Sequence, residues 1–527
     1  MAQIARPREG NQLGGAASTA PSVLPIITAA PGVRSKIAAI VARDFSVTPL
    51  KVLIAGDSNS RSGYYANGNT TARISTYERL CQYLGSPMTG FTSLENPMSG
   101  GCYVPFGPTP QMNLYDEFGN VRCQNSSNWI KAAPPTNGQF TGGSTSFVKD
   151  PASAGYAAMR LDRRQSTYAQ FAGKHDFEMT ATRMKVFFSV GQSSSVQIDR
   201  LFGNTSMSTG ATDATVVGNG FHGTLTIRLW DMVGAASISS TTVTATTSNS
   251  RGLNHWGGWT TDWITLPNSG TYPYIEIRCE TAIGVRVAVD GVWFDDGSPK
   301  IQVFDGSYPG RAISHISPIT YSQLGVSTDT SFAARRNYML GIRHLTKAQY
   351  LSPLTFDATD YALASAPTHY PVFSGGLDAV LHPCVANDIA NDTPAKIKAE
   401  LLAMMAEFVV DNPDGIFIHP IILRGMGPLA SLDSYIAGTA TVGGIANQSW
   451  AMYRQAIYEV QAAYPNNFVV MDLNQAINNK FFAGAQPTAT ALNSTLGFYS
   501  ASDGLHTDPW VEDNIALSTS LFLSGKI

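Results

Sequence analysis

The sequence is poor in charged residues. Of its 527 residues, 14% are Asp, Glu, Lys or Arg, and the formal net charge is −3. Proteins that bind nucleic acid neutralise phosphates with clustered Lys and Arg side chains, and no basic run occurs here. The charge content therefore argues against a nucleic-acid partner.

Cysteine is also scarce. The chain has five cysteines, an odd number, and none of them forms a CxxC pair. This argues against a disulfide framework and against a zinc site. Cys102 could pair with Cys123, but free buried thiols are the favoured interpretation. We predict no metal and no other cofactor.

Long apolar runs are absent as well. No run approaches the roughly 18 residues that cross a membrane, so we predict no membrane span. The first residues, "MAQIARPREGNQLGG", lack the basic start and apolar core of a secretory signal. We therefore expect a protein made without an export signal. It would stay in the cytoplasm or leave by another route, such as inside a virus particle.

What the sequence does contain is typical of a folded protein of several domains. Apolar residues make up 43% and aromatic residues 10%. Residues 1–45 are predicted to be an arm or linker, extended over 1–32, followed by a short helix. Residues 46–145 begin with a short apolar run, "KVLIAG", and then show helical spacing over 71–85, ended by Gly85. The rest of this segment is predicted to be long loops.

The pattern then changes twice. Over residues 146–299, strand-like segments alternate with turn residues and show no helical spacing, which predicts a β-sandwich of jelly-roll type. Over residues 300–527, apolar runs alternate with amphipathic helices, for example the helix predicted over 393–410. The simplest topology is one α/β domain with a parallel sheet, split by an inserted all-β domain.

Polar residues follow several of the predicted strands. Because ligand sites in parallel α/β sheets gather where the strands end, these residues are candidates for chemistry. Ser58, Gly310 and Asn387 each follow an apolar run, and Asp503 and His506 lie near the C-terminus. A serine nucleophile needs a base, the base needs a carboxylate, and the tetrahedral intermediate needs hydrogen-bond donors. These five residues supply each of those parts.

Three short blocks carry a resemblance to a known family. They are "GDS" at 56–58, "VAND" at 385–388 and "DGLH" at 503–506. In this order they resemble the blocks of the SGNH hydrolase superfamily, the GDSL-type esterases. The resemblance covers perhaps 300 residues and leaves out the arm and the β-rich segment. It implies a flavodoxin-like, three-layer α/β/α fold.

The resemblance also implies roles for single residues. Ser58 would be the nucleophile, His506 the base, and Asp503 the group that orients His506. The Ser58 N–H, the Gly310 N–H and the Asn387 side chain would form the oxyanion hole. No metal is needed for this chemistry.

Several alternatives remain open. Val385 stands where the family usually has Gly, so the loop before Asn387 can differ in shape. Gly100, in "NPMSGG", is a rival to Gly310. Asn391 is a rival to Asn387, although it reads more simply as part of a helix start.

Other residues invite a functional and a structural interpretation. His382 and His419 lie in apolar runs and are predicted to be core histidines rather than part of a cleft. The candidate substrate-binding residues are Arg311, His255, Trp256 and Trp259. The last three could form a stacking platform for sugars, although such aromatic residues more often fill a sandwich core.

These features predict an ester hydrolase that removes O-acetyl groups from a polysaccharide. The absent signal and the arm suggest a virion or extracellular location, with the arm attached to other virion proteins, as in a tail fibre. A non-catalytic glycan-binding protein with a relic hydrolase domain is the alternative from another class. A lipase or thioesterase is a third. The oligomeric state, including a homo-oligomer, stays open.

Overall fold

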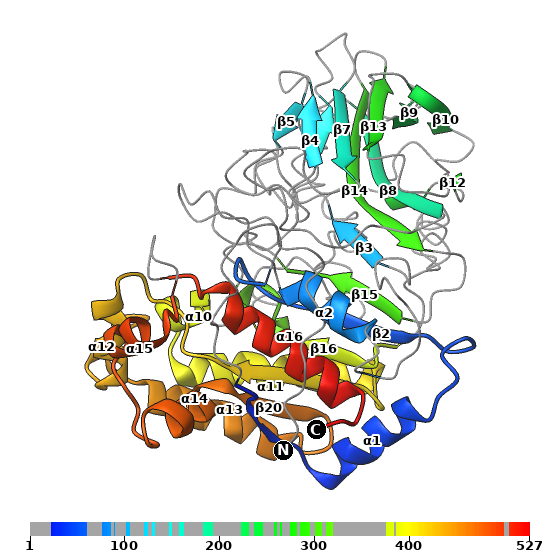
Figure 1. Ribbon diagram of the computed structural model, residues 1–527. Coiled ribbons are helices and arrows are strands. Elements are labelled where there is room, and N and C mark those ends of the chain that lie inside the picture. Colours follow the sequence, from blue (N-terminus) through cyan, green and yellow to red (C-terminus); the bar gives the residue numbers. More distant parts are fainter. Residues whose placement is uncertain are drawn as a thin grey trace, which may run out of the picture.

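The structure is a computed structural model in which part of the chain is described. The described residues are 23–60, 76–85, 89, 301–307, 312–319, 376–383, 386–499 and 505–527, with the backbone of the strands between 102 and 295. In Figure 1 the helices and the parallel strands lie in the lower half, and strands β4 to β14 lie above them.

A parallel sheet forms the centre of the lower half. Its strands, in spatial order, are β20 (Phe468–Asp472), β17 (Ile416–Ile421), β16 (Ala379–Leu381), β2 (Leu50–Ile54) and β15 (Ile301–Asp305). In chain order this is 2-1-3-4-5 read from β15, the order of flavodoxin-like sheets. The predicted α/β class with a mainly parallel sheet is confirmed.

These strands form because their apolar residues are nearly continuous. Every residue of β16, β17 and β20 is buried. Strands that are covered by helices on both faces show this composition, whereas strands with one solvent-exposed face alternate apolar and polar residues. The sheet therefore supplies the core of the lower half.

The helices cover both faces of this sheet. They are α1 (Pro31–Val41), α2 (Thr76–Leu84), α10 (Ala386–Asn391), α11 (Pro394–Asp411), α12 (Leu429–Ile436), α13 (Trp450–Ala463), α14 (Leu473–Phe481), α15 (Ala489–Leu496) and α16 (Pro509–Leu523), with a 3₁₀ turn η3 (Ile313–His315). Helices α1 and α2 pack against α16, and α11 packs against α13. Because crossovers are right-handed and the strand order reverses at β2, these two groups lie on opposite faces.

Local sequence signals mark where several helices begin. Thr393 caps α11 by accepting a hydrogen bond from the Lys396 N–H, and Pro394 is the first helical residue, as the sequence predicts. Asp508 caps α16 in the same way, followed by Pro509. Every residue of α16 from Trp510 to Leu523 is buried, so this helix lies inside the fold.

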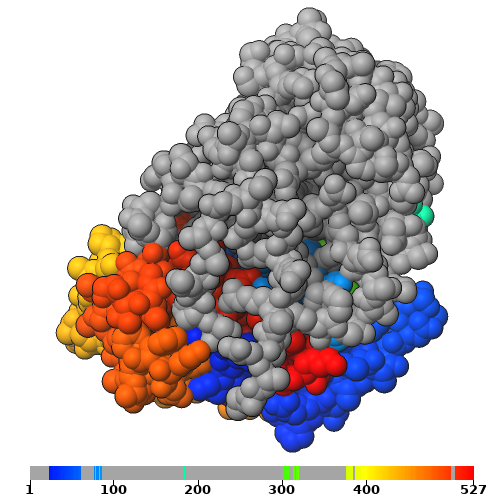
Figure 2. Space-filling view, viewed as in Figure 1, coloured from blue at the N-terminus to red at the C-terminus, as the bar shows by residue number. Residues whose placement is uncertain are grey.

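Part of the predicted N-terminal arm is a strand. Residues Ile26–Thr28 form β1, which pairs antiparallel with β20 at the edge of the sheet. Helix α1 follows directly. The space-filling view shows the larger blue surface at the right of the lower half and the orange surface at its left, with a smaller dark blue patch beside the orange surface (Figure 2).

Between α2 and β15, every element in the described part of the chain is a strand. They are β3 (Cys102–Pro105), β4 (Val121–Gln124), β5 (Trp129–Lys131), β6 (Phe147–Lys149), β7 (Ala157–Asp162), β8 (Arg183–Gln192), β9 (Gly223–Trp230), β10 (Ser237–Ala245), β11 (Gly258–Thr260), β12 (Ile264–Thr265), β13 (Tyr274–Thr281) and β14 (Val285–Asp295). Five of them form an antiparallel sheet in the order β10-β9-β13-β7-β4.

The central sheet continues into this β-rich region. Strand β3 pairs in parallel with β15 on one side and antiparallel with β14 on the other. The segment predicted as long loops up to residue 145 thus contains β3, β4 and β5. Their turn-forming surroundings hid these three short strands, and the partners of β3, which are β14 and β15, lie far along the chain. An inserted, separate β-domain remains a proposal.

Candidate active site

Three parallel strands end at the same level of the sheet. Ile54, the last residue of β2, is in register with Asp305 of β15 and with Leu381 of β16. The segments that leave these strands carry Ser58, Gly310 and Asn387 in the sequence. The fold therefore brings the start of each segment to one edge, although Gly310 itself lies outside the described residues.

A tight turn presents Ser58 at this edge. The Asp57 carboxylate accepts a hydrogen bond from the Asn59 N–H at 2.8 Å, and the Ser60 N–H donates to the Asp57 carbonyl at 3.1 Å. A methyl group on Gly56 would collide with the Ser60 side chain and lie 3.0 Å from Ser307 Oγ. Gly56 is therefore required by the close approach of the turn to its neighbours.

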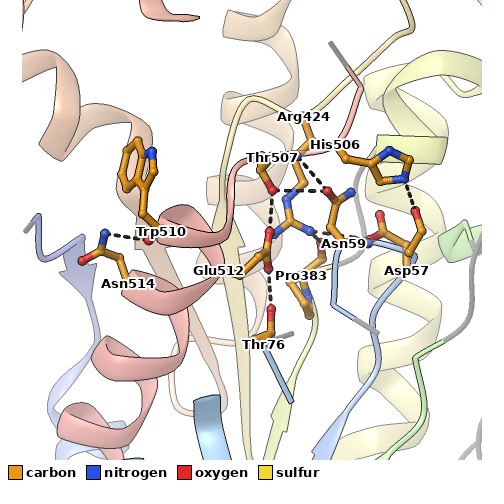
Figure 3. A network of polar contacts seen from close by, with 11 residues as sticks. Asp57, Asn59, Thr76, Pro383, Arg424, His506, Thr507, Trp510, Glu512 and Asn514 are labelled. Atoms are coloured by element: carbon orange, nitrogen blue, oxygen red, sulfur yellow. Dashed lines mark hydrogen bonds and ion pairs between the residues drawn. The ribbon is translucent and has the colours of Figure 1, made fainter. Parts of the chain in front are cut away.

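Ser58 and His506 meet at this turn. Ser58 Oγ lies 2.9 Å from His506 Nε2, although the two residues are 448 positions apart. Both side chains are buried, with exposed fractions of 7% and 4%. His506 points toward the turn that carries Asp57 (Figure 3). The hydroxyl can donate to the imidazole in this geometry, which is what a serine nucleophile needs from its base.

A second contact joins the two segments beside this pair. The Thr507 N–H donates to Asn59 Oδ1 at 3.0 Å. Thr507 Oγ lies 2.6 Å from Glu512 Oε1 and 3.2 Å from Asn59 Oδ1, and its single proton goes to the nearer carboxylate. The residues that follow Ser58 and His506 are thus tied to each other directly.

Behind the turn lies a buried charged cluster that sequence reasoning missed. Arg424, just beyond β17, has no exposed surface and donates to Glu512 Oε1 at 2.6 Å and to the Pro383 carbonyl at 2.7 Å. Its Nη1 also lies 3.7 Å from Asp57 Oδ1. Thr76, the first residue of α2, donates to the other oxygen of Glu512 (Figure 3).

The described residues of the third block, Ala386 to Asp388, begin a short helix. Asn387 and Asp388 lie in the first turn of α10, and Asp388 is fully buried. Its carboxylate accepts a hydrogen bond from the Ile313 N–H at 2.5 Å, which ties α10 to the segment that follows residue 310. The Asn391 side chain donates to the Asn387 carbonyl at 2.7 Å. Asn391 is exposed, whereas Asn387 is half-buried.

Several predicted site residues lie outside the described part of the chain. They are Asp503, Gly310, Gly100, Arg311, His255, Trp256 and the side chain of Trp259. Their assignments stay predictions. Val385, the departure from the family pattern, lies outside it too.

The two other histidines of the sheet are core residues, as the sequence predicts. His382 and His419 are fully buried, with their Nδ1 atoms 3.1 Å apart. His419 Nε2 lies 2.9 Å from the hydroxyl of Tyr453. Burial, with a smaller contribution from the Arg424 charge, lowers the pKa of His419 to about 3. His419 is therefore neutral near pH 7.

Three further features of the described residues concern metal binding, membrane spans and cysteine. In the part of the chain that the structure describes, no group of three or more His, Cys, Asp or Glu side chains could hold a metal ion. Among the described helices, none is both long and apolar enough to cross a membrane. Cys81, in α2, is fully buried.

Comparison with known proteins gives structural likenesses only. No family model and no curated protein matches the sequence. A solved peptidoglycan O-acetylesterase is 11% identical, with a TM-score of 0.47, over 95% of this chain and 98% of its own.

Two further solved structures are similar at a lower level. A family two carbohydrate esterase from Clostridium thermocellum is 8% identical, with a TM-score of 0.23, over 72% of this chain and 94% of its own. A family 29 carbohydrate-binding module is 8% identical, with a TM-score of 0.20, over 37% of this chain and 94% of its own. All three TM-scores are below 0.5, so what the chain can do is argued from its own site.

Proposed function

We propose that this chain is a serine esterase of the SGNH type. One observation carries the proposal: Ser58 Oγ lies 2.9 Å from His506 Nε2, at the end of a parallel strand. The two residues belong to sequence blocks that resemble the family blocks in their order along the chain. A hydroxyl that donates to a buried imidazole is suited to attack an acyl group.

The proposed reaction has two stages. In the first, Ser58 Oγ attacks the ester carbonyl carbon while His506 Nε2 takes the serine proton. The intermediate collapses to an acyl-serine, and His506 returns the proton to the departing alcohol. In the second stage His506 activates a water molecule, which releases the acid and restores Ser58.

The remaining roles follow from the resemblance. Asp503 would accept the Nδ1 proton of His506, fix the tautomer and stabilise the imidazolium. The oxyanion would receive hydrogen bonds from the N–H groups of Ser58 and Gly310 and from the Asn387 amide. The register of β2, β15 and β16 supports this grouping, because it starts all three segments at one edge.

As the substrate we propose O-acetyl groups on a polysaccharide. Support comes from the resemblance to a family with members that deacetylate polysaccharides, and from the β-rich region, where His255, Trp256 and Trp259 are candidate sugar contacts. The choice of substrate rests on a fold-level analogy, and it depends on the proposal that the chain is an esterase. We further propose a virion or extracellular setting, in which the N-terminal arm attaches the enzyme to its particle.

The experiment compares wild type with Ser58→Ala on p-nitrophenyl acetate and on acetylated polysaccharides. We expect wild type to release acetate from both and Ser58→Ala to lose about 10⁴-fold or more in turnover, because the members of a catalytic triad act as a unit. If both proteins are equally inert and the protein binds glycan, the non-catalytic alternative replaces the esterase. A preference for long acyl chains over acetyl would favour a lipase or thioesterase.

A further inference from the structure

Arg424 is a charged residue in a place where charge is costly. It lies three residues beyond β17, and its side chain has no exposed surface. Burying a guanidinium is unfavourable unless its donors are matched by acceptors and its charge by a carboxylate. The contacts of Arg424 therefore indicate what its burial achieves.

Those contacts reach three separate parts of the fold. One Nη atom donates to Glu512 in α16, and the other donates to the Pro383 carbonyl in the segment that leads from β16 to α10. The second Nη atom also faces Asp57 at 3.7 Å. This distance is too long for a hydrogen bond, so the attraction is between charges.

Two of these contacts, those with Asp57 and Glu512, lead to chain neighbours of the Ser58–His506 pair. Asp57 precedes Ser58 and fixes the Asn59 N–H. Asn59 accepts a hydrogen bond from the N–H of Thr507, the residue after His506. Thr507 in turn donates to the same Glu512 oxygen that Arg424 binds. The contacts thus form a closed ring beside the pair.

We propose that Arg424 is a positioning residue that sets the separation of Ser58 Oγ and His506 Nε2. This inference rests on the proposed esterase function and adds a residue to it. Arg424 holds Glu512, and through it Thr507, on one side and attracts Asp57 on the other. Arginine suits the role because its planar fork can bind two acceptors at once, whereas lysine is a single charged centre.

The same ring could act only to stabilise the fold. The two roles predict different results for a variant that folds. A positioning role lowers kcat and leaves KM nearly unchanged, since the substrate-binding surface is intact. A stabilising role lowers the melting temperature and leaves kcat alone.

The test uses Arg424→Lys and Glu512→Gln in the full chain, with p-nitrophenyl acetate as substrate. We expect each variant to lose about 10- to 100-fold in kcat with KM within about threefold, because a displacement of about 1 Å can cost this much. The matched control is Arg454→Met, which breaks the 2.6 Å ion pair between Arg454 and buried Asp472 elsewhere in the fold. It should lower the melting temperature and keep kcat within about twofold of wild type.

Three outcomes would overturn the inference. The first is a folded Arg424→Lys protein with wild-type kcat. The second is failure of both variants to fold while Arg454→Met folds, because this assigns the ring to stability.

If wild type and Ser58→Ala are equally inactive, the proposed esterase function fails, and a crystal structure of Arg424→Lys then tests the positioning role by itself. A Ser58–His506 separation beyond hydrogen-bond reach supports positioning, and one unchanged at 2.9 Å is the third contrary outcome.

Discussion

At the scale of single residues, two asparagines compete for one role. Asn387 is half-buried in the first turn of α10. The exposed Asn391 uses its amide to donate to the Asn387 carbonyl, one turn back along the same helix. A side chain engaged in this way is poorly placed to meet an oxyanion, so the amide of Asn387 is the better candidate.

Replacing each asparagine separately with alanine tests which amide is the oxyanion donor. We expect Asn387→Ala to lower kcat by about 10²- to 10³-fold, which is the cost of removing one oxyanion donor. Asn391→Ala, the matched control on the same helix, should stay within about threefold. Steady-state kinetics on p-nitrophenyl acetate decide the matter, and the reverse ranking would assign the donor to Asn391.

A second prediction concerns Gly425. A methyl group on this residue would lie 2.6 Å from the Leu505 carbonyl oxygen and 2.7 Å from its Cα atom. Because Leu505 precedes His506, the backbone that carries the imidazole would have to move. We expect Gly425→Ala to lower kcat at least tenfold.

Gly415→Ala is the control for this change. Its methyl group would lie 2.8 Å from Phe408 and 2.9 Å from Asn412 and the Leu377 carbonyl, which are all away from Ser58 and His506. It should destabilise the protein while kcat stays near wild type. Equal losses of kcat in the two folded variants would show that general strain, rather than movement of His506, is responsible.

At the scale of elements, strands β16 and β17 are joined by more than their ladder. His382, next to the end of β16, and His419, in β17, share a hydrogen bond between their Nδ1 atoms, and Tyr453 of α13 completes the chain. A single proton serves the contact between the two Nδ1 atoms. The strands and the helix are therefore linked through His419, whose pKa is lowered by burial so that its imidazole is neutral near pH 7.

This arrangement predicts that acid destabilises the fold. The pKa of His419 is lowered to about 3, while an unfolded imidazole binds a proton below about pH 6.5. The unfolded state therefore binds more protons between these values, and the free energy of unfolding falls as the pH drops through this window. The loss should be of the order of a few kcal/mol, at about 1.4 kcal/mol per pKa unit.

Urea unfolding at pH 7 and pH 5 measures this loss. In His419→Gln the side chain does not titrate and can still hydrogen-bond, so the difference between the two pH values should shrink. If the variant and wild type lose equal free energy between pH 7 and pH 5, another group governs the acid sensitivity.

At the scale of the whole molecule, the β-rich region is continuous with the parallel sheet. Strand β3 covers the edge of β15, with Cys102 opposite Val303 and Tyr103 opposite Phe304. An exposed edge of a buried, apolar strand invites pairing with other chains. Pairing with β3 therefore stabilises the parallel sheet, even if the other strands of the β-rich region fold as a separate unit.

Excision of residues 87–299, with a flexible linker in their place, tests this continuity. We expect the shortened chain to melt at a lower temperature and to aggregate, because β15 loses its neighbour. A second variant that retains residues 87–105 before the linker should recover part of the solubility. Thermal unfolding and size-exclusion chromatography measure both, and an excised chain as stable as wild type would indicate an independent insert.

Much of the fold and part of the site could be predicted from sequence alone. Apolar runs predict β2, β17 and β20 because buried parallel strands need them, and Thr393 with Pro394 predicts the start of α11. Ser58 could be chosen because it follows an apolar run, and His506 because it belongs to the "DGLH" block, which resembles the family block near the C-terminus.

Only the tertiary structure decided which distant groups meet. Nothing near Arg424 in the sequence indicates that it binds Glu512, and nothing near Asn59 indicates that it receives the Thr507 N–H. Local periodicity fixes how a segment folds, since it reflects which face is buried. The partner of a buried polar group depends on the path of the whole chain, and here that path brings residues 448 positions apart to within 2.9 Å.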